Sequence, residues 1–257
     1  MPDLMPVGFI GHGSPMNVVD EPNYAPWRVW GAHLPTPTAI LAVSAHWEDT
    51  PVSLGTTASH SDLVYDFYGF PEFMYRLGYQ APGAPALADR VTTLLDGYDV
   101  RRTERGLDHG VWVPLMHLFP EADIPVLQIS MPIAMSEAEL FDLGGELSPL
   151  RSEGVLILGT GNLTHNLREA FVADPDAPPP EYAATFDEWA ASALRRRDHA
   201  ALQSWRDEAP DAFRSHPSAE HFRPILVAAG AARADDAVFP IEGFELGLIS
   251  RRSVQFN

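Results

Sequence analysis

Residues 39–47 of this 257-residue chain are Ala39-Ile-Leu-Ala-Val-Ser-Ala-His-Trp47, a short apolar run that ends on a histidine. The uninterrupted apolar character of Ala39–Ser44 predicts a strand buried on both faces, as in parallel sheets. Three similar runs predict further buried strands: Val7–Ile10, Ile124–Ser130 and Val155–Gly159. Weaker patterns predict edge or antiparallel strands: Val52–Thr56, Asp99–Arg102, Phe244–Ile249 and Ser253–Phe256.

Helical patterns alternate with these strands. Ser136 and Glu139 form a capping box before a predicted helix at Leu140–Leu150, and an apolar stripe predicts a long helix at Pro180–Trp205. The remaining predicted helices are Pro85–Leu95, Trp112–Phe119 and Ala219–Ala229, and the proline-rich Ala173–Pro180 is expected to be a surface loop. The alternation favours an α/β fold. We expect a single domain over residues 1–257, with a central, mostly parallel sheet flanked by helices on both faces.

The composition narrows the chemistry that the chain can perform. It contains no cysteine, which excludes disulfides, iron–sulfur clusters, thiolate zinc sites and cysteine nucleophiles. All 17 basic residues are arginine, so a lysine Schiff base and a phosphate-binding loop lysine are also excluded. Ten histidines remain as the main candidates for catalysis or metal binding.

Charge and hydropathy set expectations about partners and location. The net charge of −18 disfavours nucleic acid and anionic membrane surfaces, because both carry negative charge. No apolar run approaches the roughly 18 residues of a membrane span. The N-terminus lacks the basic region and apolar core of a signal peptide. We therefore expect a cytoplasmic protein with no membrane or nucleic acid partner.

Three histidines lie at or just beyond the ends of separate predicted strands, namely His12, His46 and His165. Ligands of open parallel sheets bind at the carboxyl ends of the strands, so these imidazoles are expected to converge. Imidazole is a good ligand for zinc, iron, copper and nickel. Several imidazoles without thiolates are typical of a catalytic metal site.

Further histidines lie in loops that precede predicted helices. His109 comes before the helix at Trp112–Phe119, and His216 and His221 come before or within the first turn of Ala219–Ala229. With Ser218 as the N-cap, His221 is predicted to project from the helix end toward the site. The other four histidines are expected to be structural: His33, His60, His117 and His199.

Two other motifs suggest different functions but fit them poorly. Gly159-Thr-Gly161 follows a strand, as in a dinucleotide-binding loop, but the third glycine is missing. Gly11-His-Gly-Ser14 differs from the Gly-x-Ser-x-Gly turn of serine hydrolases.

Together, several segments resemble the class III extradiol ring-cleavage dioxygenases, specifically the 4,5-DOPA dioxygenase extradiol-like branch. The similar segments span nearly the whole chain: Phe9–Asn17, Val43–Trp47, Tyr65–Pro71, Tyr79–Leu87, Leu107–Trp112, Gly161–Asn166 and Glu220–Pro224. The resemblance implies that His12, His46 and His221 bind a metal. It places His165 as a fourth ligand or an acid/base, and His109 in contact with the substrate. Distant members of the class use a glutamate as third ligand, and Glu220 is adjacent to His221.

The function that this resemblance implies is insertion of O₂ into a catecholic ring, giving a ring-opened semialdehyde. Fe(II) is the expected working metal, and an all-histidine site could carry zinc in the isolated protein. The expected partners are a small catechol and O₂, in a monomer or small homo-oligomer. Aromatic residues of Tyr65–Phe73 either form a wall of the site against bulk water or serve in packing alone. Arg223 either pairs with a substrate carboxylate or is solvated on a helix surface.

Two alternatives remain open from the histidines alone. One is a zinc-dependent hydrolase with Glu48 or Asp108 as its base, and the other is a non-catalytic, chelatase-type metal-binding protein. Neither explains similar segments without a candidate ligand, such as Tyr65–Pro71 and Tyr79–Leu87.

Overall fold

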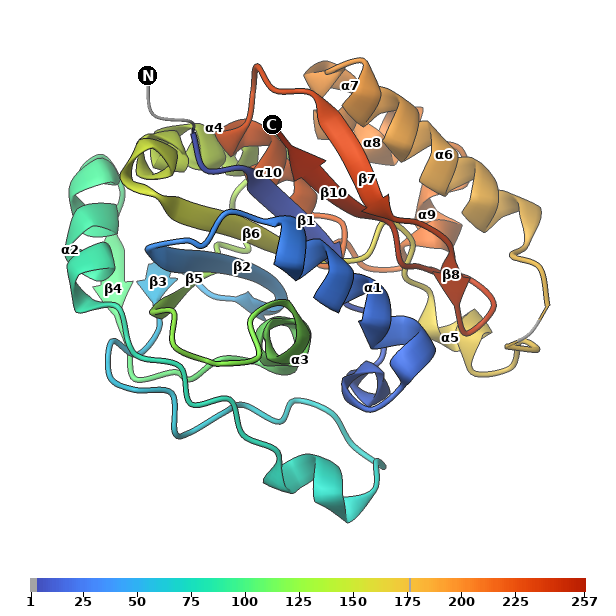
Figure 1. Cartoon of the computed structure of the whole chain (residues 1–257). Coiled ribbons are helices and arrows are strands. Elements are labelled where there is room, and N and C mark those ends of the chain that lie inside the picture. The colour runs from blue at the N-terminus through green and yellow to red at the C-terminus, as the bar shows by residue number, and fades with distance from the viewer. Residues whose placement is uncertain (1–3, 176) are drawn as a thin grey trace.

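An eight-stranded sheet runs through the centre of the computed structural model, which describes residues 4–175 and 177–257 (Figure 1). Its strand order is β4-β3-β5-β2-β6-β1-β10-β7. The strands are β1 (Val7–Gly11), β2 (Ala39–Glu48), β3 (Val52–Leu54), β4 (Val100–Arg102), β5 (Val126–Met131), β6 (Val155–Gly161), β7 (Ala237–Ile241) and β10 (Ser253–Phe256). The central strands β5, β2, β6 and β1 are parallel, whereas β10 and β7 add an antiparallel edge. This confirms the predicted mostly parallel sheet.

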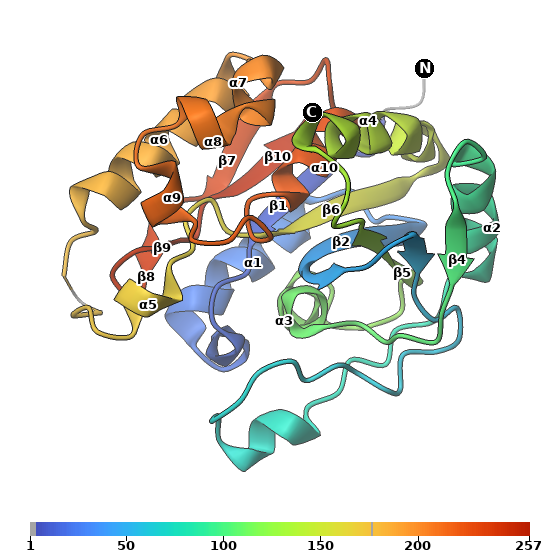
Figure 2. The ribbon, with the colours of Figure 1, turned by 180° about the vertical axis from the view of Figure 1, so that it is seen from behind.

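Helices cover both faces of this sheet, as predicted (Figures 1 and 2). Along β2, Ile40 and Ala42 pack into one apolar cluster, and Leu41 and Val43 pack into the other. The first cluster includes side chains of α1 (Glu21–His33) and α3 (His109–Leu118). The second includes side chains of α2 (Pro85–Leu94), α4 (Glu137–Leu147), α6 (Glu181–Arg195), α7 (His199–Gln203), α8 (Trp205–Glu208), α9 (Ala212–Ser215) and α10 (Pro224–Ala231). A strand buried on both faces needs apolar residues at every position, which explains the continuous runs.

The predicted helix at Pro180–Trp205 is wrong as a single element. α6 ends at Arg195, and Arg197 adopts a left-handed backbone with φ of 54°, which a continuous helix cannot contain. The chain continues as α7 and α8. The capping box of Ser136 and Glu139 is confirmed, but it starts α4 at Glu137, and the helix ends at Leu147 before a 3₁₀ turn at Ser148–Glu153.

Two further boundaries differ from the predictions near the site. The predicted Ala219–Ala229 helix begins only at Pro224, because proline occupies the first helical position of α10. His221 therefore lies in the preceding turn, and Ser218 bonds Glu220 instead of capping a helix. In contrast, α3 begins at His109, three residues before the predicted Trp112.

The C-terminal strands also differ from the prediction at one point. The predicted strand Phe244–Ile249 is a hairpin of β8 (Phe244–Glu245) and β9 (Ile249–Ser250), because Leu246 and Gly247 both turn with positive φ.

Helix α1 and strand β7 were not predicted. The loop at Ala173–Pro180 is confirmed for its described residues; Asp176 lies outside them, as do residues 1–3.

None of the helices in the described part of the chain combines the length and apolar character that a membrane crossing needs.

Candidate metal centre and active site

The carboxyl ends of neighbouring strands bring two of the candidate ligands together. His12 directly follows β1, and His46 lies near the end of β2. Both strands pair with β6 between them, and the Nε2 atoms of His12 and His46 lie 3.1 Å apart. His12 is 2% exposed, so this meeting point lies inside the protein.

The third histidine reaches the site because the end of β6 contains a glycine. His221 lies in the turn before α10, and its carbonyl accepts a hydrogen bond from the Asn162 amide at 2.9 Å. A Cβ at Gly161 would lie 2.1 Å from that carbonyl oxygen, so a larger residue would push the turn away. The glycine thus allows the two backbones to approach closely enough for His221 to join His12 and His46.

The three rings surround one small volume. Their centroids are 5.0 to 5.4 Å apart, and one nitrogen of each ring lies within 4.8 Å of the others. Such spacing suits side chains that share one ion.

Hydrogen bonds fix which nitrogen of His12 carries the proton. The hydroxyl of Thr160 donates to the Gly110 carbonyl at 2.5 Å, so it can only accept from Nδ1 of His12, at 2.8 Å. The proton of His12 therefore resides on Nδ1, and the lone pair of Nε2 is free for a metal.

Carboxylates do the same for the other two rings. Nδ1 of His46 lies 3.1 Å from Asp66, and Nδ1 of His221 lies 3.1 Å from Glu220. An ionised carboxylate can only accept, so both Nδ1 atoms donate, which leaves both Nε2 atoms unprotonated. Three neutral imidazoles with oriented Nε2 atoms form a donor set that fits iron or zinc.

The electrostatic surroundings favour the neutral form that metal binding requires in two of the three rings. Burial, together with the neighbouring histidines, lowers the pKa of His12 and of His221 well below the usual value. Burial also lowers the pKa of His46, but its hydrogen bond to Asp66 and the nearby carboxylates produce a net rise. As the pH falls, His46 is therefore the first of the three ligands to gain a proton. A metal ion must displace that proton in order to bind.

Asp66 contacts two histidines of this site and was not predicted from the sequence. Its two oxygens accept from Nδ1 of His46, at 3.1 Å, and from Nδ1 of His109, at 2.8 Å. Burial raises the pKa of Asp66, but the hydrogen bonds from both histidines outweigh it and lower the pKa far below the usual value. Asp66 lies within the similar segment Tyr65–Pro71, which was the only signal that could have revealed it.

His165 lies beside the three-histidine group. Its ring is stacked on that of His221, with centroids 3.4 Å apart and planes 9° apart. Its nitrogen falls within ligand-sharing distance of Glu220 and His221, a group that does not include His12 and His46. Burial lowers the pKa of His165 to about 3, so the ring is neutral near pH 7.

His216 does not reach the site. Its Nε2 bonds the Leu163 carbonyl at 2.8 Å, and its ring packs against Phe186, Trp205 and Phe222. The other histidines expected to be structural each bond a backbone carbonyl: His33, His60, His117 and His199.

Arg223 is neither available to a substrate nor solvated on a helix surface, so both expectations for it are wrong. Its guanidinium is buried, bonds Glu48 at 2.8 Å and lies 3.4 Å from Glu137. Glu48 follows His46 by two residues, and Arg223 follows His221 by two. This ion pair therefore ties the strand that carries one ligand to the turn that carries another.

The carboxylates considered for a hydrolase do not line the cavity. Glu48 is held by Arg223, and Asp108 is fully buried with its Oδ1 2.7 Å from the Ser44 hydroxyl. Neither is placed to activate water.

A cavity of about 300 Å³ opens over the histidines. Phe67, Tyr68 and Phe70 form part of its wall, which confirms the expected role of the Tyr65–Phe73 segment. Other lining residues come from α5 (Leu167–Ala170) and its end, and from the β8–β9 hairpin: Leu167, Phe171, Glu245, Leu246 and Ile249. Its size and aromatic lining suit a small aromatic ligand.

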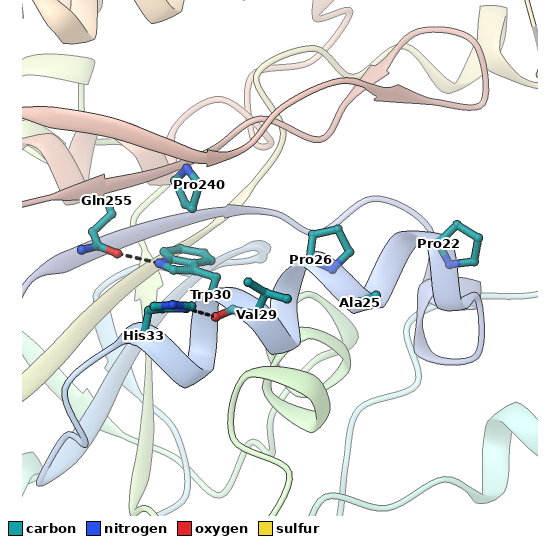
Figure 3. Close-up of a pocket in the computed structure, with 8 residues that line it drawn as sticks. All are labelled: Pro22, Ala25, Pro26, Val29, Trp30, His33, Pro240 and Gln255. Atoms are coloured by element: carbon teal, nitrogen blue, oxygen red, sulfur yellow. Dashed lines mark hydrogen bonds between the residues drawn. The ribbon is translucent and has the colours of Figure 1, made fainter.

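A larger hollow of about 550 Å³ lies along α1, between Pro22 and His33 (Figure 3). Its single histidine bonds the Val29 carbonyl through Nδ1, and Trp30 donates to Gln255 at 2.6 Å. Among the residues that line it, no titratable groups converge, so the chemistry belongs to the smaller cavity.

Comparison with known proteins decides the family. The sequence model of the catalytic LigB subunit of aromatic ring-opening dioxygenase matches residues 7–257. The chain belongs to this family. It is 38% identical to the 4,5-DOPA dioxygenase extradiol of Beta vulgaris, over 97% of this chain and 95% of that protein. It is equally 38% identical to the protein of that name from Escherichia coli (strain K12), over 98% and 95%.

A solved structure agrees with the family assignment. The crystal structure of an uncharacterized protein from Escherichia coli K12 matches with a TM-score of 0.85 and 34% identity, over 98% of this chain and 100% of that chain. This LigB family member is therefore an enzyme of the extradiol ring-cleavage dioxygenase class, and the family implies a catalytic metal.

Proposed function

We propose that this enzyme uses Fe(II), held by His12, His46 and His221, to open a catecholic ring with O₂ beside its two hydroxyls, yielding a semialdehyde. The observation that carries the proposal is the convergence of three oriented Nε2 atoms at the aromatic-lined cavity. When bound, the metal supplies a Lewis acid for the diol and the electron path that O₂ chemistry requires.

The first role of the chain is to move protons. His165 is neutral near pH 7 and lines the cavity, so it can accept a proton from a phenolic hydroxyl and later return it. His109 also lines the cavity, and Asp66 holds the proton on its Nδ1. The Nε2 atom of His109 is therefore left as a hydrogen-bond acceptor for the substrate.

The second role is to exclude water. Phe67 and Phe70 pack edge to face, with centroids 5.2 Å apart, and Phe67 also packs against the ring of His109. An apolar wall beside the acid/base residues strengthens the electrostatic interactions within the site.

The test of the proposal uses the full chain. Metal content is measured first, because the same donors bind zinc. Metal-free protein is then loaded anaerobically with Fe(II), a catechol is added, and O₂ is admitted. We expect O₂ uptake and a yellow ring-opened product, whereas no uptake across several catechols would contradict the proposal.

Replacing Asp66 with Asn is expected to lower both metal affinity and turnover by about 10- to 100-fold. An amide has one acceptor oxygen and one donor nitrogen, so it cannot accept from both His46 and His109. One of the two rings loses its fixed tautomer. Metal titration and kcat measure the two effects, and Asp62→Asn, an exposed change in the same loop, is the control. Identical behaviour of the two variants would argue against this role for Asp66.

A further inference from the structure

Few formally charged side chains line the cavity. Among the described residues that line it, none is arginine, and the chain contains no lysine. The formally charged side chains that line it are Asp66 and Glu245, both acidic. Away from the histidine cluster, an incoming substituent therefore meets the carboxyl group of Glu245 and no arginine or lysine.

Glu245 is fixed in place on β8. Its Oε1 accepts from the Ser14 amide at 2.5 Å, and its Oε2 accepts from Asn17 at 2.6 Å. Gly13 makes room for this carboxylate, because a Cβ there would lie 2.1 Å from Oε1. Arg251 lies 3.8 Å from Oε2, but it is bound to Asn23 and does not line the cavity.

The rim of the cavity is exposed and apolar. Tyr68 is 88% exposed, Phe171 is 78% exposed, and Leu167 and Leu246 are also exposed. Both views place α5 beside the β8–β9 hairpin, on which Leu246 lies (Figures 1 and 2). Large exposed apolar side chains gathered around a cavity mark a surface that receives a ligand.

We infer that the cavity selects catechols whose ring substituent is apolar or cationic and discriminates against those that carry a carboxylate. This inference rests on the proposed function. A carboxylate on the substituent would lose hydration at the apolar rim without gaining a cationic partner. It would also be repelled by the carboxylate of Glu245, whereas an ammonium group would be attracted by it.

The experiment measures binding rather than turnover. Protein loaded with Fe(II) under anaerobic conditions is titrated in a calorimeter with three catechols of similar size. Their substituents are a propyl group, an aminoethyl group and a carboxymethyl group. We expect the neutral and cationic catechols to bind about tenfold more tightly than the carboxylate.

A matched pair of variants separates the effect of a charge on the rim from the effect of the overall charge of −18. Phe171→Arg places a cation on the exposed rim, while Val172→Arg places the same charge on the next residue, which is 84% exposed but does not line this cavity. Phe171→Arg should tighten binding of the carboxymethyl catechol about five- to tenfold. Val172→Arg should leave it close to that of the parent protein.

The outcomes distinguish the two proposals. Equal binding of all three catechols by the parent protein, or equal effects of the two arginine variants, would overturn the inference on selectivity. The dioxygenase proposal would survive that result. If none of the catechols binds the metal-loaded protein, the proposed function fails, and the inference that rests on it fails with it.

Discussion

The His165→Gln variant is expected to turn over catechols about 10²- to 10⁴-fold more slowly than the parent protein while retaining its full metal content. Glutamine has a similar reach and can form hydrogen bonds, but it cannot accept a proton in the accessible pH range. The metal should remain because His12, His46 and His221 form a group of their own without His165. The result requires kcat and metal analysis on the same sample.

The opposite outcome would assign a different role to His165. If His165→Gln lost its metal on dialysis, the ring would be a fourth ligand, which its stacking on His221 at 3.4 Å brings into range. If the metal and the turnover were both retained, the acid/base role would be excluded. His109→Gln provides a comparison. His109 also lines the cavity, and its Nδ1 is hydrogen-bonded to Asp66.

The His46→Ala variant should weaken metal binding by more than about 100-fold and reduce turnover below detection. It removes one of three Nε2 ligands and leaves Asp66 with only His109 as a histidine partner. The fold should persist, because the side chain of His46 is 19% exposed and contributes little to the apolar core. Thermal unfolding, metal content after dialysis and O₂ uptake report these effects separately.

The matched control is His33→Ala, an exposed histidine on α1 outside this cavity. This variant should resemble the parent protein in all three measurements. Stoichiometric metal and normal turnover in His46→Ala would show that the three-histidine group is not the metal site.

The central sheet could be predicted because its strands are buried on both faces. Ala39–Ser44 and Val155–Gly159 are continuous apolar runs, and such runs leave little choice of structure in a chain of this length. The rule that ligands gather at the carboxyl ends of parallel strands then places His12 and His46 correctly without any knowledge of side-chain positions.

The rest of the site depends on contacts that are distant in sequence. His221 was assigned to a helix because Ser218 resembles an N-cap, whereas Pro224 actually begins α10 and the close approach at Gly161 positions the turn. Asp66 and Glu245 are single acidic residues in irregular segments, with no periodicity to distinguish them. Their roles emerge only once His46, His109 and Ser14 are close in space.

Strand β7 and helix α1 escaped prediction for local reasons. The exposure of β7 alternates, and it contains Pro240, which is tolerated because the strand is at the sheet edge. Helix α1 has Pro22 and Pro26 in its first two turns, so its sequence resembles a loop.

The separate origins of the ligands and of the cavity wall have an evolutionary consequence. His12 and His46 are anchored to strands at the centre of the sheet, whereas Tyr68, Phe171 and Leu246 project from connecting segments at the surface. Changing those exposed side chains would alter which molecules are accepted without moving the strands that carry His12 and His46. Substrate preference can thus change in such a lineage while the metal centre stays in place.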